Sequence, residues 1–148
     1  MAVVTKSAQE TAALGEKIAN QLIIKHEPLI IALTGELGSG KTTFVQGLAK
    51  GLGIKGRILS PTFIMIREYT VHRTKNKEQR FYHIDLYRIE DEKDIEGLGL
   101  EEIWNNHQNI VAIEWAEKIK NILPKKRIDI YFKYLKNDKR EIKVTGVY

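Results

Sequence analysis

A strongly apolar run that leads straight into a glycine-rich loop constrains the fold of this chain more than any other feature. Residues 29–33 read Leu-Ile-Ile-Ala-Leu, as expected of a strand buried on both faces. After the loop, residues 42–52 place apolar side chains at helical spacing, with glycines flanking the end of this segment. A strand, a loop and a helix in this order indicate an α/β fold.

The loop itself, residues 35–42, reads Gly-Glu-Leu-Gly-Ser-Gly-Lys-Thr and matches G-x-x-x-x-G-K-[ST] in full. Glycines let the backbone fold around an anion, so that successive N–H groups point inward, and the helix N-terminus adds its positive dipole end. We expect Lys41 to reach the β- and γ-phosphate oxygens of a nucleotide and the Thr42 hydroxyl to ligate Mg²⁺. The residues expected to bind the nucleotide here are Glu36, Leu37, Gly38, Ser39, Gly40, Lys41, Thr42 and Thr43.

The rest of the chain supplies further helices, strands and hairpins. The patterns predict a helix over 8–24, a hairpin of 63–69 and 80–87, one or two short helices in 91–104, a buried strand at 110–113, and a second hairpin in 127–147. Together these units predict one domain, residues 1–148. Its expected form is a three-layer α/β sandwich like that of P-loop NTPases, with a mixed, mainly parallel sheet and antiparallel hairpins.

Two carboxylates are expected at the ends of neighbouring apolar segments. Asp85 ends the segment Phe-Tyr-His-Ile, and Glu114 ends Ile-Val-Ala-Ile. A strand-end carboxylate near a phosphate loop can hold the metal, directly or through water, or orient the attacking water. The sequence does not rank the two, so Asp85 and Glu114 are both candidates for metal binding and, with Lys41, for catalysis. Because both end strands, we expect them to lie outside the core.

Two aromatic side chains next to these acids leave alternatives open. His83 precedes Asp85 by two residues, so in a strand the two side chains share a face. It contacts phosphate or Asp85 in one interpretation, and in the other it is a packed histidine satisfied by hydrogen bonds. Trp115 follows Glu114 and either lies beside the nucleotide or belongs to the core.

Composition excludes several classes of protein. With 148 residues, 43% hydrophobic and 29% charged, the chain has the balance of a globular rather than a disordered protein. It has no cysteine, which excludes disulfides and thiolate metal sites, and no apolar run near the roughly 20 residues that span a bilayer. With no secretion signal visible, we expect a cytoplasmic protein without a membrane segment. The net charge of +5 fits a nucleic-acid partner or, since the basic residues are scattered, a solvated surface.

Other nucleotide chemistries match less well. Residues 94–97 and 76–79 resemble GTPase elements in letters only, because no apolar strand precedes the first and the second lacks its aspartate. A small-molecule kinase would need an acceptor pocket and usually an arginine-bearing lid, and no lid-like insertion is evident. ATP hydrolysis or ATP-gated binding is therefore favoured over phosphoryl transfer to a metabolite.

Four motifs in a fixed order suggest a family. They are residues 35–44, Ser-Pro-Thr-Phe at 60–63, Tyr-His-Ile-Asp-Leu-Tyr-Arg at 82–88, and Ile-Glu-Trp at 113–115. In this combination, from the first helix to the C-terminal hairpin, the chain resembles the TsaE (YjeE) family of bacterial ATPases of tRNA threonylcarbamoyladenosine synthesis.

The resemblance implies roles for single residues. Glu114 would be the second protein ligand of Mg²⁺, and Asp85 would serve the metal's water shell or the hydrolytic water. Thr62 would face the γ-phosphate from a switch loop, and Trp115 would lie close to the nucleotide. Thr11 and Arg140 would flank the adenine. The family commonly has proline after the Glu-Trp pair, where this chain has Ala116.

The resemblance also implies partners. TsaE-like proteins act with TsaD and TsaB, and tRNA would be reached indirectly through that complex. Hydrolysis, slow for the protein alone and stimulated by the partners, would reset the complex between turnovers. The alternatives are a nucleotide-dependent regulatory binding module with negligible turnover, and a small-molecule kinase.

Overall fold

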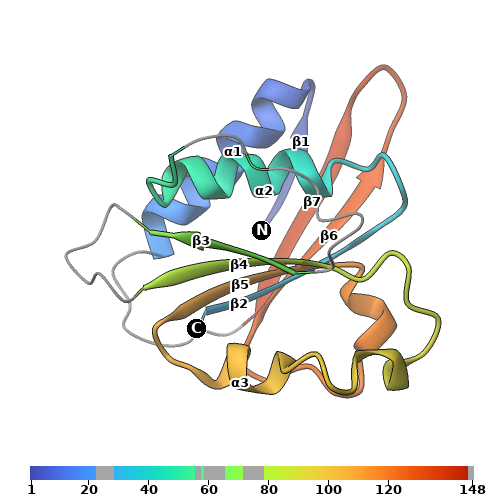
Figure 1. Cartoon of the computed structure of the whole chain (residues 1–148). Coiled ribbons are helices and arrows are strands. Elements are labelled where there is room, and N and C mark those ends of the chain that lie inside the picture. Colours follow the sequence, from blue (N-terminus) through green and yellow to red (C-terminus); the bar gives the residue numbers. More distant parts are fainter. Residues whose placement is uncertain (23–28, 56–57, 59–65, 72–78, 147–148) are drawn as a thin grey trace.

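A seven-stranded sheet forms the middle layer of the computed structural model, which describes residues 1–22, 29–55, 58, 66–71 and 79–146. The strands follow one another across the sheet in the order β1-β7-β6-β2-β5-β4-β3 (Figure 1). The strands are β1 (Ala2–Thr5), β2 (Leu29–Gly35), β3 (Ile66–Thr70), β4 (Arg80–Asp85), β5 (Asn109–Glu114), β6 (Ile128–Tyr134) and β7 (Arg140–Gly146). The helices are α1 (Ala8–Leu22), α2 (Lys41–Gly51), η1 (Glu92–Ile95), α3 (Leu100–Asn105) and η2 (Ala116–Ile119), η denoting a 3₁₀-helix.

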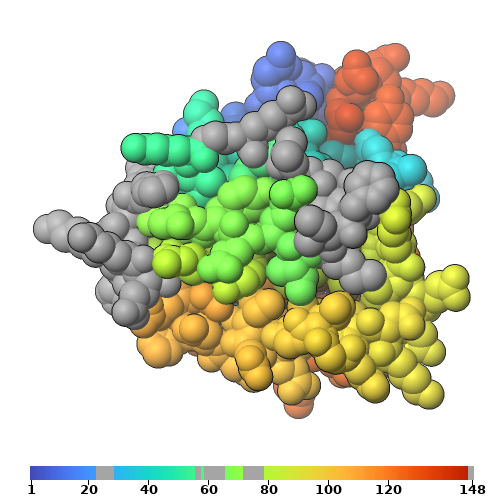
Figure 2. Space-filling model, viewed as in Figure 1, coloured from blue at the N-terminus to red at the C-terminus, as the bar shows by residue number. Residues whose placement is uncertain are grey.

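Strand direction divides the sheet into a parallel centre and antiparallel flanks. β6, β2, β5 and β4 pair parallel to one another, whereas β3–β4, β6–β7 and β1–β7 pair antiparallel. The carboxyl ends of β2, β4 and β5 therefore lie at the same edge of the sheet. β3 is an edge strand, and Figure 2 shows its green residues at the surface between teal α2 and the yellow-to-orange segment that carries η1 and α3.

Side chains of β2 alternate between two hydrophobic clusters, one on each face of the sheet. Ile31 and Leu33 pack against α1 and α2, whereas Ile30 and Ala32 pack toward η1, α3 and η2. Burial on both faces explains why this strand reads as a continuous apolar run rather than as an alternating pattern. Helices cover both faces (Figure 1), so the predicted three-layer α/β arrangement is confirmed.

The two helices on the first face lie unusually close together. A Cβ atom added at Gly47 of α2 would lie 1.8 Å from the carbonyl oxygen of Ala12 in α1. Gly15 of α1 makes a similar approach, because a Cβ there would lie 2.3 Å from the carbonyl oxygen of Phe44. Close contact of the two backbones fixes the first turn of α2, which carries the lysine and threonine of the glycine loop.

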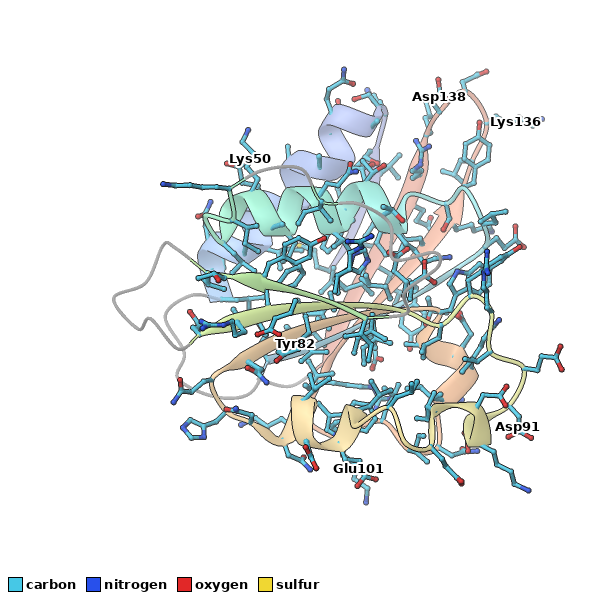
Figure 3. The ribbon with its side chains drawn as sticks, viewed as in Figure 1. Lys50, Tyr82, Asp91, Glu101, Lys136 and Asp138 are labelled. Carbon is cyan, nitrogen blue, oxygen red and sulfur yellow. The ribbon has the colours of Figure 1, made fainter. Side chains whose placement is uncertain are left out.

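Most predicted elements agree with the structure within a few residues. The helix predicted over 8–24 is α1, the segment 91–104 divides into η1 and α3, and the turn of the C-terminal hairpin has left-handed residues at Asn137 and Asp138. Lys136 and Asp138 lie at the tip of that hairpin (Figure 3). β1 and η2 were not predicted. Residues 23–24, 60–65 and 76–78, about which the sequence made predictions, lie outside the described residues.

No helix in the described ranges is long and apolar enough to cross a membrane.

Candidate functional site

The glycine loop joins the carboxyl end of β2 to the start of α2 and borders a pocket of about 370 Å³. Gly40, the residue before α2, has φ 105°, a backbone conformation that favours glycine. A Cβ there would also lie 2.8 Å from Cδ of Arg140. The pocket is lined by Leu37, Gly38, Ser39, Gly40, Lys41, Thr42, Thr43, Asp85, Tyr87, Glu114, Trp115 and Arg140.

Lys41 folds back over its own loop. Its Nζ donates hydrogen bonds to the carbonyl oxygens of Gly35 and Glu36, the second at 3.1 Å, and lies 3.9 Å from the centroid of the Trp115 ring. Burial lowers the pKa of Lys41, while the nearby carboxylates of Glu117, Glu114 and Asp85 act in the opposite direction. The loop thus holds a partly desolvated ammonium group beside the pocket.

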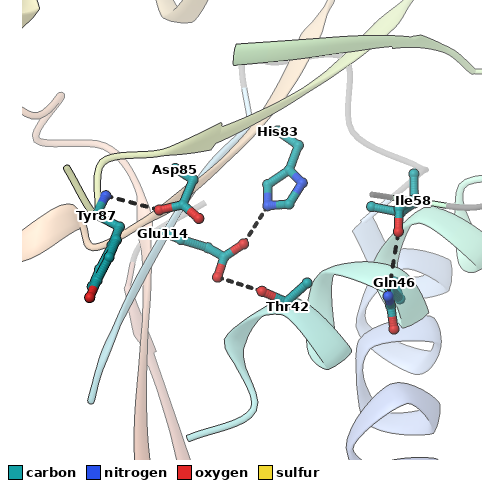
Figure 4. Close-up of polar contacts among 7 residues, drawn as sticks. All are labelled: Thr42, Gln46, Ile58, His83, Asp85, Tyr87 and Glu114. Atoms are coloured by element: carbon teal, nitrogen blue, oxygen red, sulfur yellow. Dashed lines mark hydrogen bonds and ion pairs between the residues drawn. The ribbon is translucent and has the colours of Figure 1, made fainter. Parts of the chain in front are cut away.

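Thr42, Glu114 and His83 form a chain of hydrogen bonds that links α2, β5 and β4 (Figure 4). The Thr42 hydroxyl donates to Glu114 Oε1 at 2.9 Å, and His83 Nε2 lies 2.5 Å from Glu114 Oε2. Of the two interpretations open for His83, the structure favours the packed histidine over contact with phosphate or Asp85. Its ring is buried, hydrogen-bonds to Glu114 and does not line the pocket. The hydroxyl and the carboxylate predicted to hold a metal are in direct contact.

Asp85 lies beside Glu114 because the two residues are register partners on β4 and β5. Its Oδ1 accepts a hydrogen bond from the backbone N–H of Tyr87 at 2.9 Å (Figure 4). Burial raises the pKa of Asp85; the Tyr87 bond counteracts this, and the charge of Glu114 adds to it. The expectation that both acids lie outside the core was wrong, since Asp85 is 8% and Glu114 2% exposed. At this strand end the first turn of α2 contacts Glu114 through Thr42.

Trp115 follows Glu114 in a left-handed conformation with φ 61°, which is rare for a bulky residue. Its ring lies 5.4 Å from that of Tyr87 and 3.9 Å from the ammonium group of Lys41. Ala116 is buried at the start of η2, so the chain turns here without the proline common in the family. The structure therefore supports a place for Trp115 at the pocket rather than wholly in the core.

Thr11 and Arg140 both lie near Gly40 of the loop. A Cβ at Gly40 would lie 3.5 Å from Cγ2 of Thr11, and Arg140 lines the pocket. The Thr11 hydroxyl is 2.7 Å from that of Thr5, so in this structure Thr11 lies behind the loop rather than in the pocket lining. Thr62 lies outside the described residues.

Glu117 is a further charged residue at the loop that the sequence did not single out. Burial raises its pKa, whereas the charge of Lys41 and a hydrogen bond from the backbone N–H of Gly35 lower it. Its position three residues after Glu114 carries no motif. The unusual turn at Trp115, which aims η2 back at the loop, brings it there.

The donor set fits Mg²⁺ better than a metal held wholly by protein. No group of three or more His, Cys, Asp or Glu side chains suited to a metal occurs in the part of the chain that the structure describes. Mg²⁺ usually takes one or two carboxylates and keeps several waters, so a Thr42 hydroxyl with Glu114 and Asp85 nearby is adequate. The Ser39 hydroxyl, buried and without a hydrogen-bond partner among the described residues, is a further polar atom in the loop.

Comparison with known proteins identifies the family of the chain. A family model described as "Threonylcarbamoyl adenosine biosynthesis protein TsaE" matches residues 5–142. The tRNA threonylcarbamoyladenosine biosynthesis protein TsaE of Bacillus subtilis (strain 168) is 43% identical over 118 residues, covering 80% of this chain and 70% of its own. That of Treponema pallidum (strain Nichols) is 36% identical over 145 residues, covering 98% of this chain and 100% of its own.

A solved structure also matches, the crystal structure of Bacillus subtilis YdiB, with a TM-score of 0.78 and 34% identity. The match covers all of this chain and 86% of YdiB. Since the family model spans most of the chain and the relatives match over most of their length, the chain belongs to the TsaE family of threonylcarbamoyl adenosine biosynthesis proteins.

Proposed function

We propose that this protein binds Mg-ATP at the glycine loop and hydrolyses it in support of tRNA threonylcarbamoyladenosine biosynthesis. Membership of the TsaE family supports the biosynthetic role. The observation that carries the nucleotide chemistry is the 2.9 Å bond between the Thr42 hydroxyl and Glu114 Oε1, at the edge of the pocket that also contains Lys41. A hydroxyl and a carboxylate held together beside a phosphate loop are what a P-loop enzyme uses to bind Mg²⁺.

Each residue of the site would bind the phosphates, hold Mg²⁺ or orient the attacking water. The ammonium group of Lys41 would give up its hydrogen bonds to the carbonyl oxygens of Gly35 and Glu36 and donate to phosphate oxygens instead. Hydrogen bonds to charged phosphate oxygens are stronger, so they stabilise a buried ammonium group better. Thr42 and Glu114 would hold Mg²⁺, which when bound draws negative charge from the phosphates. Asp85 would orient the attacking water, and because burial raises its pKa it is a stronger proton acceptor than an exposed aspartate.

We place the protein in the cytoplasm, where it would act with TsaD- and TsaB-like partners and reach tRNA only through them. Hydrolysis would reset that complex between rounds of modification. The family supports this assignment through its role in the modification.

The test is the rate of phosphate release from ATP by the purified protein, alone and with the TsaD–TsaB pair of the same host, with Lys41→Ala as the blank. We expect slow turnover alone and faster turnover with the pair. Deleting the gene in a host without a second copy is expected to remove the tRNA modification.

Two other outcomes would replace the proposal. If phosphate release equals that of the blank in both conditions while Mg-nucleotide binding is tight, the protein is a regulatory binding module. If ADP forms only when a small metabolite is added as acceptor, it is a kinase.

A further inference from the structure

His83 is a fully buried histidine that aims one ring nitrogen at the carboxylate of Glu114. Its side chain is 0% exposed, and Nε2 lies 2.5 Å from Glu114 Oε2. An ionised carboxylate only accepts hydrogen bonds, so Nε2 carries the proton and donates it to this bond. His83 is absent from the lining of the pocket, and among the described residues its hydrogen bond to the site is the one with Glu114.

The carboxylate of Glu114 is held from two sides. Thr42, in the first turn of α2, donates to Oε1, while His83 on β4 occupies Oε2 (Figure 4). With one bond to each oxygen, the carboxylate group cannot rotate about its last bond without breaking both. Its orientation at the loop is thus set by two elements that belong to different layers of the fold.

The second nitrogen of His83 argues against a purely structural role. Nδ1 is buried and has no hydrogen-bond partner among the described residues. A buried polar atom without a partner costs free energy, and an apolar side chain in this core would avoid that cost. In the part of the chain that the structure describes, the hydrogen bond of the ring is the one to Glu114, so that bond accounts for a histidine at this position.

We propose that His83 is a positioning residue, which orients Glu114 so that Oε1 stays at Thr42 and the metal position. The inference rests on the proposed function, because it assigns Glu114 to Mg²⁺. Residues that hydrogen-bond to a metal ligand orient it, and their loss typically costs about 10-fold to 100-fold in metal affinity.

The test compares nucleotide affinity with and without Mg²⁺, measured by calorimetry with ADP, for wild type and His83→Leu. We call the ratio of the affinity with Mg²⁺ to the affinity without it the Mg²⁺ enhancement. In the leucine variant this ratio should be smaller by about 10-fold or more. Its affinity without Mg²⁺ should stay within about two-fold of wild type, since no phosphate contact has changed. An unchanged Mg²⁺ enhancement, or equal losses with and without Mg²⁺, would overturn the proposal.

Three variants guard against an effect on folding alone. His83→Gln can still present a donor to Oε2, whereas His83→Asn is equally polar but too short, so the first should retain the Mg²⁺ enhancement and the second lose it. If both behave alike, the proposal is wrong. Ile84→Val changes the neighbouring side chain on the opposite face of β4 and should leave the enhancement unaltered.

A double variant separates this inference from the proposed function. In Glu114→Gln, removal of the His83 donor should have no further effect on the Mg²⁺ enhancement, because the two residues act as a unit. An additive further loss would mean that His83 acts elsewhere. If the wild type binds ADP with no dependence on Mg²⁺, the proposed metal site itself is wrong and the inference falls with it.

Discussion

The ammonium group of Lys41 lies 3.9 Å above the ring of Trp115, so the residue expected to bind phosphate touches a fluorophore. Moving Lys41 onto a nucleotide removes a positive charge from the face of the indole. We therefore expect Mg-ATP to change the emission of Trp115. Trp104, which is buried on α3 and absent from the pocket lining, provides the control: Trp104→Phe should keep the change and Trp115→Phe should lose it. Tight binding without any change in Trp115 emission would mean that Lys41 stays where it is.

Replacing Lys41 by alanine should weaken nucleotide binding by about 10-fold or more, since hydrogen bonds to charged groups contribute about 1.5–3 kcal/mol. The dissociation constant for Mg-ATP, measured by titration calorimetry, gives the result. Lys136→Ala removes the same charge at the exposed tip of the β6–β7 hairpin and should bind as wild type. Similar losses for both variants would point to a general charge effect rather than to the loop.

Asp85→Asn is expected to separate activity from stability. Because burial raises the pKa of Asp85 above its unfolded value, folding favours the protonated form, and the ionised carboxylate destabilises the protein as pH rises through that pKa. At neutral pH the asparagine variant should therefore unfold at the same or a higher temperature than wild type. Its hydrolysis rate should fall about 100-fold or more, the usual contribution of a general base.

The control for that variant is Asp138→Asn, at an exposed turn that asparagine also tolerates, which should alter neither property. Thermal unfolding without nucleotide, repeated at pH 4 and pH 8, tests the sign of this pH dependence, because the stability change begins near the ordinary aspartate pKa. The stability of wild type relative to Asp85→Asn should be greater at the lower pH. A marked drop in the melting temperature of the asparagine variant at pH 8 would contradict the assignment.

The contact of α1 with α2 predicts that Gly47→Ala destabilises the protein. Alanine favours a helix over glycine by about 1 kcal/mol, but its Cβ would lie 1.8 Å from the carbonyl oxygen of Ala12. The backbones must move apart, so we expect a net loss of about 1–3 kcal/mol in the free energy of unfolding, measured with urea. Lys50→Ala on the same helix, whose side chain points to solvent (Figure 3), should cost less than about 1 kcal/mol.

The elements that the sequence predicted well are those whose signals are local. The apolar run of β2, the glycine loop and the spacing of α2 lie within 23 consecutive residues, 29–51. β1 was missed because it is a four-residue edge strand whose partner, β7, lies at the other end of the chain. Its four residues have no pattern that distinguishes a strand from a loop until β7 is in place.

In the candidate site, too, the sequence predicted what depends on local signals and missed what depends on distant parts of the chain. Asp85 and Glu114 were found because they end apolar segments, and parallel strands end at one edge of a sheet. Their burial and their shared register could not be predicted, since both depend on the order of strands in the sheet and on the helices that cover it. The bond from His83 to Glu114 requires that β4 and β5 be neighbours, and Glu117 reaches the loop only through the left-handed turn at Trp115.

The hydrogen bonds around Glu114 also connect parts of the chain that are far apart in sequence, since Thr42 is 72 residues from Glu114 and His83 is 31. The metal ligands are thus scattered in the unfolded chain and meet only when β4 and β5 have paired and α2 has docked on them. Contacts of such long range form late in folding, because the loops between them must close first. Recovery of Mg-nucleotide binding after dilution from denaturant should therefore report the completed sheet, and the nucleotide should stabilise only the native state.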